Sequence, residues 1–130
     1  MLLDSSGLLC LLDAAEKRHE AAKEHYFQRD RKVIHNYVLS EFISLAISRL
    51  RDPRPAVNLV REIRTSPHVE LYWVDEELHD AGMGLLDRRR DKTYSLCDAV
   101  SFVLMRRLGL TDALTTDRHF TQEGFVRLLA

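Results

Sequence analysis

Short apolar runs alternate with amphipathic stretches along the whole chain. The apolar runs, rich in leucine, isoleucine and valine, predict strands at residues 1–3, 32–35, 69–74, 113–116 and 125–128. The amphipathic stretches predict helices at residues 7–12, 18–28, 37–50, 55–64, 76–90, 95–108 and 118–123. Strands that alternate with helices in this way are typical of a parallel sheet covered on both faces. We therefore predict a three-layer α/β domain.

Capping and helix-breaking residues set the ends of the predicted helices. Asn36 is the predicted N-cap of the helix at residues 37–50, and Asp52-Pro53 lies beyond the end of that helix. Gly109 follows the helix at residues 95–108, where glycine commonly closes a helix. Because no linker or internal repeat interrupts this order, the 130 residues are predicted to form one domain, residues 1–130.

Composition narrows the class of protein. A net charge of −1 gives no broad basic surface, which argues against a dedicated nucleic-acid-binding module but allows local basic patches. No apolar run approaches the ~20 residues of a membrane span, and the amino terminus lacks the basic region that precedes the apolar segment of a signal sequence. Cys10 and Cys97 have neither disulfide-framework nor zinc-ligand spacing, so both are expected to be core thiols. We expect a cytoplasmic protein without a membrane partner.

Four acidic residues lie where a predicted strand ends or a helix begins: Asp4, Glu41, Asp98 and Asp117. The carboxyl ends of parallel strands are where α/β folds bind ligands. Four carboxylates meeting there would repel one another without a cation, and carboxylate oxygens are the ligands that Mg²⁺ and Mn²⁺ prefer. The pattern therefore predicts a divalent metal site.

Each acid also has a structural interpretation. Asp4 and Asp117 are suitable N-caps for the helices that follow them, and Ser95 with Asp98 has the spacing of a capping box. Glu41 is different, because it shares a helix face with apolar Val38 and Leu45, where an unpaired carboxylate is costly. Capping and metal binding are compatible, so both interpretations remain open for the three aspartates.

The other usual catalytic arrangements are missing from the sequence. The histidines form no pair at ligand spacing, and only His35 and His119 fall near the proposed site. No nucleophilic Ser-His-Asp or Cys-His set can be assembled, and no glycine-rich phosphate loop occurs. Of the candidate chemistries, metal binding by carboxylates is the one that the sequence favours.

Four segments, taken in order, resemble one known family. They are LLDSSGLL around Asp4, HNYVLSEF around Glu41, YSLCDAVSF around Asp98 and LTTDRHF around Asp117. Each string alone is weakly specific, but their order and separation across nearly the whole chain are similar to those of PIN-domain ribonucleases, in particular VapC-type toxins. The bulky Ser101-Phe102-Val103 departs from the small residues usual after the third acid.

The resemblance implies a parallel five-stranded sheet with flanking helices and an acidic pocket for one or two Mg²⁺ or Mn²⁺ ions. Asp4, Glu41, Asp98 and Asp117 match the family's acidic positions and are the expected catalytic and metal-binding residues. Hydroxyl residues that match positions beside the metal are Ser5, Ser6 and Thr116.

The resemblance also implies metal-dependent hydrolysis of RNA that leaves a 5′-phosphate and a 3′-hydroxyl. Two basic clusters are the expected phosphate contacts at the rim of the site: Arg88, Arg89, Arg90 and Lys92, and Arg49, Arg51 and Arg54. His119 is a further expected RNA contact, although basic residues at a helix end also suit the helix dipole. A small antitoxin protein would hold such a toxin inactive, with Phe42, Ile43, Ile47 and Leu59 as candidate apolar contacts. A homodimer and a DNA substrate remain open.

Two other functions are compatible with parts of this sequence pattern. Phosphatases of the haloacid-dehalogenase class also begin with an aspartate after a first strand, but they need a second acid where this chain has Ser6. A degenerate PIN-like module that binds RNA or protein without catalysis would not need all four acids, and this chain retains them. Both points favour a ribonuclease.

Overall fold

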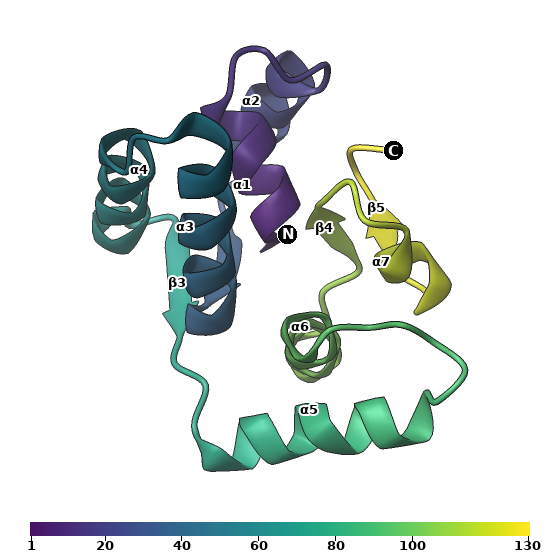
Figure 1. Ribbon diagram of the computed structural model, residues 1–130. Coiled ribbons are helices and arrows are strands. Elements are labelled where there is room, and N and C mark those ends of the chain that lie inside the picture. Colours follow the sequence, from purple (N-terminus) through teal and green to yellow (C-terminus); the bar gives the residue numbers. More distant parts are fainter.

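The computed structural model describes residues 1–130. A five-stranded sheet lies between two groups of helices (Figure 1). The strands are β1 (Leu2–Leu3), β2 (Lys32–His35), β3 (Val69–Tyr72), β4 (Asp112–Leu114) and β5 (Val126–Arg127). They pair in the order β3-β2-β1-β4-β5, and every pair is parallel. The predicted parallel five-stranded α/β fold is confirmed.

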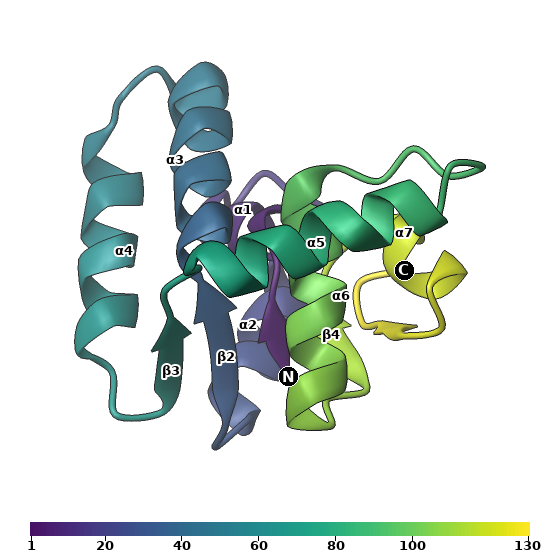
Figure 2. The ribbon, with the colours of Figure 1, turned by 90° about the horizontal axis from the view of Figure 1, so that it is seen from below.

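Seven helices cover the two faces of the sheet. They are α1 (Ser5–Leu12), α2 (His19–Gln28), α3 (Asn36–Leu50), α4 (Arg54–Thr65), α5 (Glu76–Arg88), α6 (Leu96–Leu108) and α7 (Arg118–Gln122). The first four lie on one side of the strands, and α5 to α7 lie on the other (Figure 1). Helix α5 crosses the outer surface of α6 (Figure 2).

Successive side chains along each strand point to opposite faces of the sheet, so the buried core is divided into one cluster on each face. Leu3 and Ile34 belong to the buried cluster formed with α1 and α3, whereas Leu2 and Val33 belong to the cluster formed with α5, α6 and α7. Both residues of each pair are fully buried, so these strands are apolar on both faces, as expected for a parallel sheet under helices. The central strand β1 therefore ends at a fixed point, and Asp4 follows it.

The first helix packs directly on β4 through a glycine. A Cβ atom added to Gly7 would lie 2.0 Å from the carbonyl oxygen of Leu114, closer than any real contact. Leu114 oxygen in turn accepts a hydrogen bond from the backbone N–H of Asp4 at 3.2 Å. Only glycine lets α1 approach closely enough to bring its first turn beside the end of β4.

Two predicted details are wrong at the element ends. Asn36 is the first residue of α3 rather than its N-cap, and its side-chain oxygen accepts a hydrogen bond from the backbone N–H of Val74 at 2.6 Å. Strand β4 ends at Leu114 rather than at residue 116, and beyond it the Thr115 hydroxyl donates to Asp4 and the Thr116 N–H donates to the Ser6 hydroxyl. The remaining boundaries differ from prediction by a few residues at most.

Both cysteines are buried and unpaired, as predicted. None of the helices combines the length and the apolar character needed to span a bilayer.

Candidate active site

Asp4 lies at the carboxyl end of the central strand, and its residue is only 3% exposed. Its Oδ2 atom accepts hydrogen bonds from the hydroxyl of Thr115 at 2.7 Å and from the hydroxyl of Ser6 at 2.8 Å. Burial raises the pKa of Asp4 to about 7, although the two hydroxyls oppose this shift and the charges of Asp98 and Glu41 add to it. A carboxylate this deeply buried is costly unless a cation compensates it.

Glu41 reaches the same place from the second turn of α3. Its carboxylate accepts a hydrogen bond from the hydroxyl of Ser5, the first residue of α1. The side chain is half-buried, and its charge contributes to the raised pKa values of Asp4 and of the Cys97 thiol. The predicted conflict between Glu41 and its apolar helix face is therefore resolved by the hydrogen bond that its carboxylate accepts from Ser5.

Asp98 forms the predicted capping box and also lies among the acids of the site. Ser95 and Asp98 form a complete capping box, with Asp98 Oδ2 accepting from the Ser95 N–H at 3.1 Å. Burial also raises the pKa of Asp98, with the charge of Asp117 adding to the effect. The first turn of α6 thus presents a buried carboxylate to Asp4 while the cap fixes its orientation.

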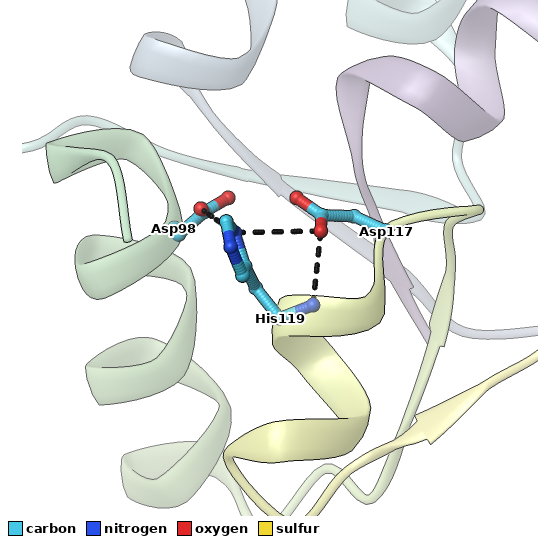
Figure 3. A group of neighbouring side chains, drawn as sticks. All are labelled: Asp98, Asp117 and His119. Atoms are coloured by element: carbon cyan, nitrogen blue, oxygen red, sulfur yellow. Dashed lines mark hydrogen bonds and ion pairs between the residues drawn. The ribbon is translucent and has the colours of Figure 1, made fainter. Parts of the chain in front are cut away.

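Asp117 and His119 complete the site from the start of α7. Asp117 caps this helix through its Oδ1 atom, which accepts from the backbone N–H of His119 at 2.9 Å. The Nδ1 atom of His119 lies 3.1 Å from Asp98 Oδ2 and 3.4 Å from Asp117 Oδ1, between the two carboxylates (Figure 3). One ligand atom from each of these three residues lies within 4.8 Å of the others.

The four predicted acids therefore cluster at the carboxyl ends of β1 and β4, where the charges of Glu41 and Asp98 act on Asp4 and the charge of Asp117 acts on Asp98. Asp98, Asp117 and His119 form one side, and Asp4 with Glu41 forms the other. The donors are mostly carboxylate oxygens, and the mutual repulsion of the carboxylates is relieved by a divalent cation. This donor set fits Mg²⁺ or Mn²⁺ and lacks the thiolates of a structural zinc site.

Comparison of the sequence with models of protein families identifies one matching family. A model of the PIN domain matches residues 1–125. The chain belongs to the PIN-domain family. The predicted resemblance is thereby confirmed, and it extends over 125 of the 130 residues.

Individual relatives cover the whole domain. Proteins from two strains of Mycobacterium tuberculosis, both named 23S rRNA-specific endonuclease VapC20, are 32% identical over 129 residues, or 98% of this chain and 97% of theirs. The crystal structure of Mycobacterium tuberculosis VapC20, described as a sarcin-ricin loop cleaving toxin, matches with a TM-score of 0.90 and 31% identity. That match covers 99% of this chain and 98% of the crystal chain.

One hydroxyl of this PIN domain was not anticipated from the sequence. Thr116, the predicted neighbour of the metal, contributes its backbone N–H to the hydroxyl of Ser6 at 3.0 Å. The side chain that contacts Asp4 is that of Thr115, which is fully buried. The sequence Thr115-Thr116-Asp117 indicates a hydroxyl beside the acids. Which of the two threonines provides it depends on the residue at which β4 ends.

The two histidines near the site behave differently. His35 is fully buried, and its Nε2 atom lies 2.8 Å from the Ser101 hydroxyl. Burial lowers the pKa of His35 to about 4, so it is neutral at pH 7. His119 lies among the acids, and its Nε2 atom is 3.1 Å from the hydroxyl of Thr93.

The predicted basic RNA contacts differ in whether they form ion pairs with acidic residues of the protein. Arg89 forms an ion pair with buried Glu123, whereas Arg90 pairs with Asp87 and Lys92 with Asp91 on the surface. Arg88 forms no ion pair and is exposed.

Glu123, at the end of α7, is the buried centre of a hydrogen-bonded network. It also accepts hydrogen bonds from Arg106 and from the Tyr94 hydroxyl.

Proposed function

We propose that this protein is a metal-dependent endoribonuclease that hydrolyses RNA phosphodiester bonds. The observation that carries the proposal is the environment of Asp4. A carboxylate that is almost wholly buried, with a pKa of about 7 and two further acids raising it, has the perturbed character typical of catalytic sites. The relatives named as endonucleases of 23S rRNA supply the substrate class.

The acidic residues would hold one or two Mg²⁺ or Mn²⁺ ions, with Asp4, Asp98 and Asp117 as carboxylate ligands and Glu41 as a fourth. Such an ion would lower the pKa of a water molecule and neutralise charge that develops on the phosphate. Thr115 and Ser6 hold the Asp4 carboxylate in one orientation, and Ser5 does the same for Glu41. Ser95 fixes Asp98. No histidine is needed as a general base.

RNA must approach this acidic pocket on a protein with a net charge of −1. Arg88, Arg90 and Lys92 are the predicted residues best placed to supply exposed positive charge beside α7. Arg89 would contribute only by sharing its guanidinium with Glu123. Phosphate contacts of this kind fix the position of the RNA without reading its sequence.

We further propose that the protein is the cytoplasmic toxin of a toxin–antitoxin pair, as the names of its relatives suggest. Leu45 and Ile47 on α3 are each about 40% exposed and offer apolar surface to a small antitoxin. Ile43 and Leu59 pack partly against the core, and Phe42 is fully buried and belongs to it. A homodimer stays a prediction.

Cleavage of a panel of RNAs tests the enzymatic part of the proposal. The panel contains single-stranded oligonucleotides and a synthetic sarcin-ricin stem–loop of 23S rRNA, incubated with Mg²⁺ or Mn²⁺. We expect cuts at defined positions that disappear with EDTA and with Asp4→Asn but persist with Asp80→Asn, a matched change at an exposed acid on α5. Binding without cleavage by folded, metal-loaded protein would instead indicate a non-catalytic RNA-binding module.

A further inference from the structure

A cleft of about 280 Å³ opens beside the acidic pocket. Ser6 and Thr116 are among the residues that line it. Ser6 is the residue whose hydroxyl binds Asp4, and Thr116 directly precedes Asp117, so the cleft and the pocket share a wall. The volume is at the lower limit of small-molecule sites, which suits one unit of a polymer whose next unit lies at the acids.

Two arginines line the cleft, and each keeps donors available. Arg49, in the last turn of α3, pairs through one nitrogen with Glu16, and its side chain is 48% exposed. Arg18, just before α2, donates from its Nε atom to the carbonyl oxygen of Ala130 at 3.4 Å. A guanidinium group presents five N–H donors in a plane and binds phosphate through two of them at once. The pair therefore forms a local site for an anion.

Apolar side chains complete the wall of the cleft. Leu9 and Leu45 both line it, and Leu45 is 41% exposed. Exposed apolar surface next to two cations does not suit a small inorganic anion or a hydrated metal ion. It suits a nucleotide, which has an apolar base face and a charged phosphate.

We propose that this cleft binds the nucleotide next to the scissile phosphate. Arg18 and Arg49 contact the phosphate of that nucleotide, while Leu9 and Leu45 lie against its base. The inference rests on the proposed function, because it places the scissile phosphate at the acidic pocket. The cleft then helps to determine which RNA sequence or loop is accepted.

Glu16 gives this proposal a distinctive signature. Its carboxylate occupies Arg49 in the absence of RNA and competes with an incoming phosphate for the same guanidinium. Removing the charge of Glu16 therefore releases Arg49 and should strengthen RNA binding, whereas removing the charge of Arg49 should weaken it. A purely structural ion pair would respond in the same direction to loss of either partner.

The experiment measures binding of the synthetic sarcin-ricin stem–loop by fluorescence anisotropy with Mg²⁺, in the Asp4→Asn background so that the RNA stays intact. We expect Arg49→Gln and Arg18→Gln each to weaken binding about tenfold, and Glu16→Gln to strengthen it several-fold. Each arginine variant should also reduce the salt dependence of binding by roughly 0.7 in the slope of log K against log salt concentration. The exposed pair Arg31–Glu70, at the opposite end of the strands, supplies matched controls, Arg31→Gln and Glu70→Gln, which should change neither quantity.

The same substitutions in the otherwise unaltered protein separate the two proposals. If that protein cuts no RNA of the panel, the proposed function fails whatever the binding data show. If it cuts the stem–loop, the cleft variants should alter KM far more than kcat. Equal affinities, or shifts in the same direction for Glu16→Gln and Arg49→Gln, would overturn the assignment of the cleft, and so would absence of binding by every variant.

Discussion

The hydroxyl of Thr115 donates a hydrogen bond to Oδ2 of Asp4 at 2.7 Å, across 111 positions of the chain. Both residues are buried, and each follows one of the two neighbouring strands β1 and β4. The bond links the two strand ends that carry Asp4 and Asp117. It therefore ties the geometry of the acidic pocket directly to the register of the sheet.

Replacing Thr115 by valine should reduce activity without unfolding the protein. Valine keeps the shape of threonine but leaves Asp4 Oδ2 with Ser6 as its single hydroxyl partner. Loss of a partner that orients a metal ligand typically costs 10–100-fold in metal affinity or activity. We expect a fall of at least about tenfold in cleavage at limiting Mg²⁺, measured as the Mg²⁺ concentration that gives half-maximal rate.

Thr111→Val is the matched control for that experiment, because Thr111 is exposed at the amino end of β4. An unchanged Mg²⁺ requirement in Thr115→Val would mean that Ser6 alone positions Asp4.

The raised pKa of Asp4 predicts that ionisation of this residue lowers the stability of the metal-free protein as pH rises. The unfolded-state pKa is near 3.8 and the folded-state pKa near 7, so the folded protein binds more protons than the unfolded protein between these values. Asp4 therefore makes its most favourable contribution below pH 4, and this contribution is lost as pH rises through 7. Asn at this position cannot ionise and avoids the cost.

We expect Asp4→Asn to be more stable than the unsubstituted protein in EDTA, by a margin that grows to a few kcal/mol between pH 5 and pH 8. Urea unfolding of both proteins measures the margin. Burial lowers the pKa of His35 to about 4, and this makes stability rise with pH up to about 6.5. Both proteins contain His35, so its contribution cancels in the difference between their stabilities. Saturating Mg²⁺ should abolish the advantage of Asp4→Asn, and a margin that shrinks with rising pH would contradict the prediction.

The order of elements and the four acids could be predicted because both are encoded locally. Apolar runs, capping residues and Gly109 determine most of the elements within short windows of sequence. The acids follow from their places at strand ends and helix starts, and Asp98 and Asp117 are both caps and members of the pocket. Local capping rules and site geometry agree at these two positions.

Other features depend on tertiary packing that no local window contains. The choice of Thr115 over Thr116 depends on where β4 ends and on hydrogen bonds to Asp4 and Ser6, which lie 111 and 110 positions away in the chain. The burial of Glu123 depends on two arginines from distant elements. Asn36 likewise binds the chain after β3 rather than its own helix, since Val74 lies beside it only in the folded protein.

Glu123→Gln should destabilise the protein through the network that joins α7 to α6. The carboxylate is 3% exposed in its side chain and pairs with Arg89 and Arg106, which lower its pKa against the opposing effect of burial. Removing one partner of a buried pair costs up to about 3–5 kcal/mol, and the partial exposure of both arginines reduces this to about 2 kcal/mol. Chemical unfolding at pH 7 measures the loss.

Glu77→Gln provides the comparison, because Glu77 pairs with Arg107 on the surface, where water screens the charges, and its loss should cost much less than that of Glu123. Equal losses for the two variants would show that burial of Glu123 adds nothing to the strength of its ion pairs.

Gly7→Ala should be severely destabilising, and Gly84→Ala should not. A Cβ at Gly7 meets the carbonyl oxygen of Leu114 at 2.0 Å, and that backbone atom cannot move without disturbing its hydrogen bond from Asp4. Overpacking of this kind costs typically 1–3 kcal/mol, and here it also displaces the strand end that holds Thr115. We therefore expect a lower midpoint of urea unfolding together with loss of cleavage.

At Gly84, in the interior of α5, the nearest atom to an added Cβ is the end of the flexible Arg88 side chain at 3.4 Å. Alanine should there raise stability by about 0.5–1 kcal/mol, because it removes the entropic cost of glycine in a helix. Opposite changes in stability for the two variants would distinguish the steric effect of close approach at Gly7 from the effect of helix propensity at Gly84. If Gly7→Ala were also stabilising, α1 could move away from β4 without cost, and the close contact would have no part in holding Asp4 in place.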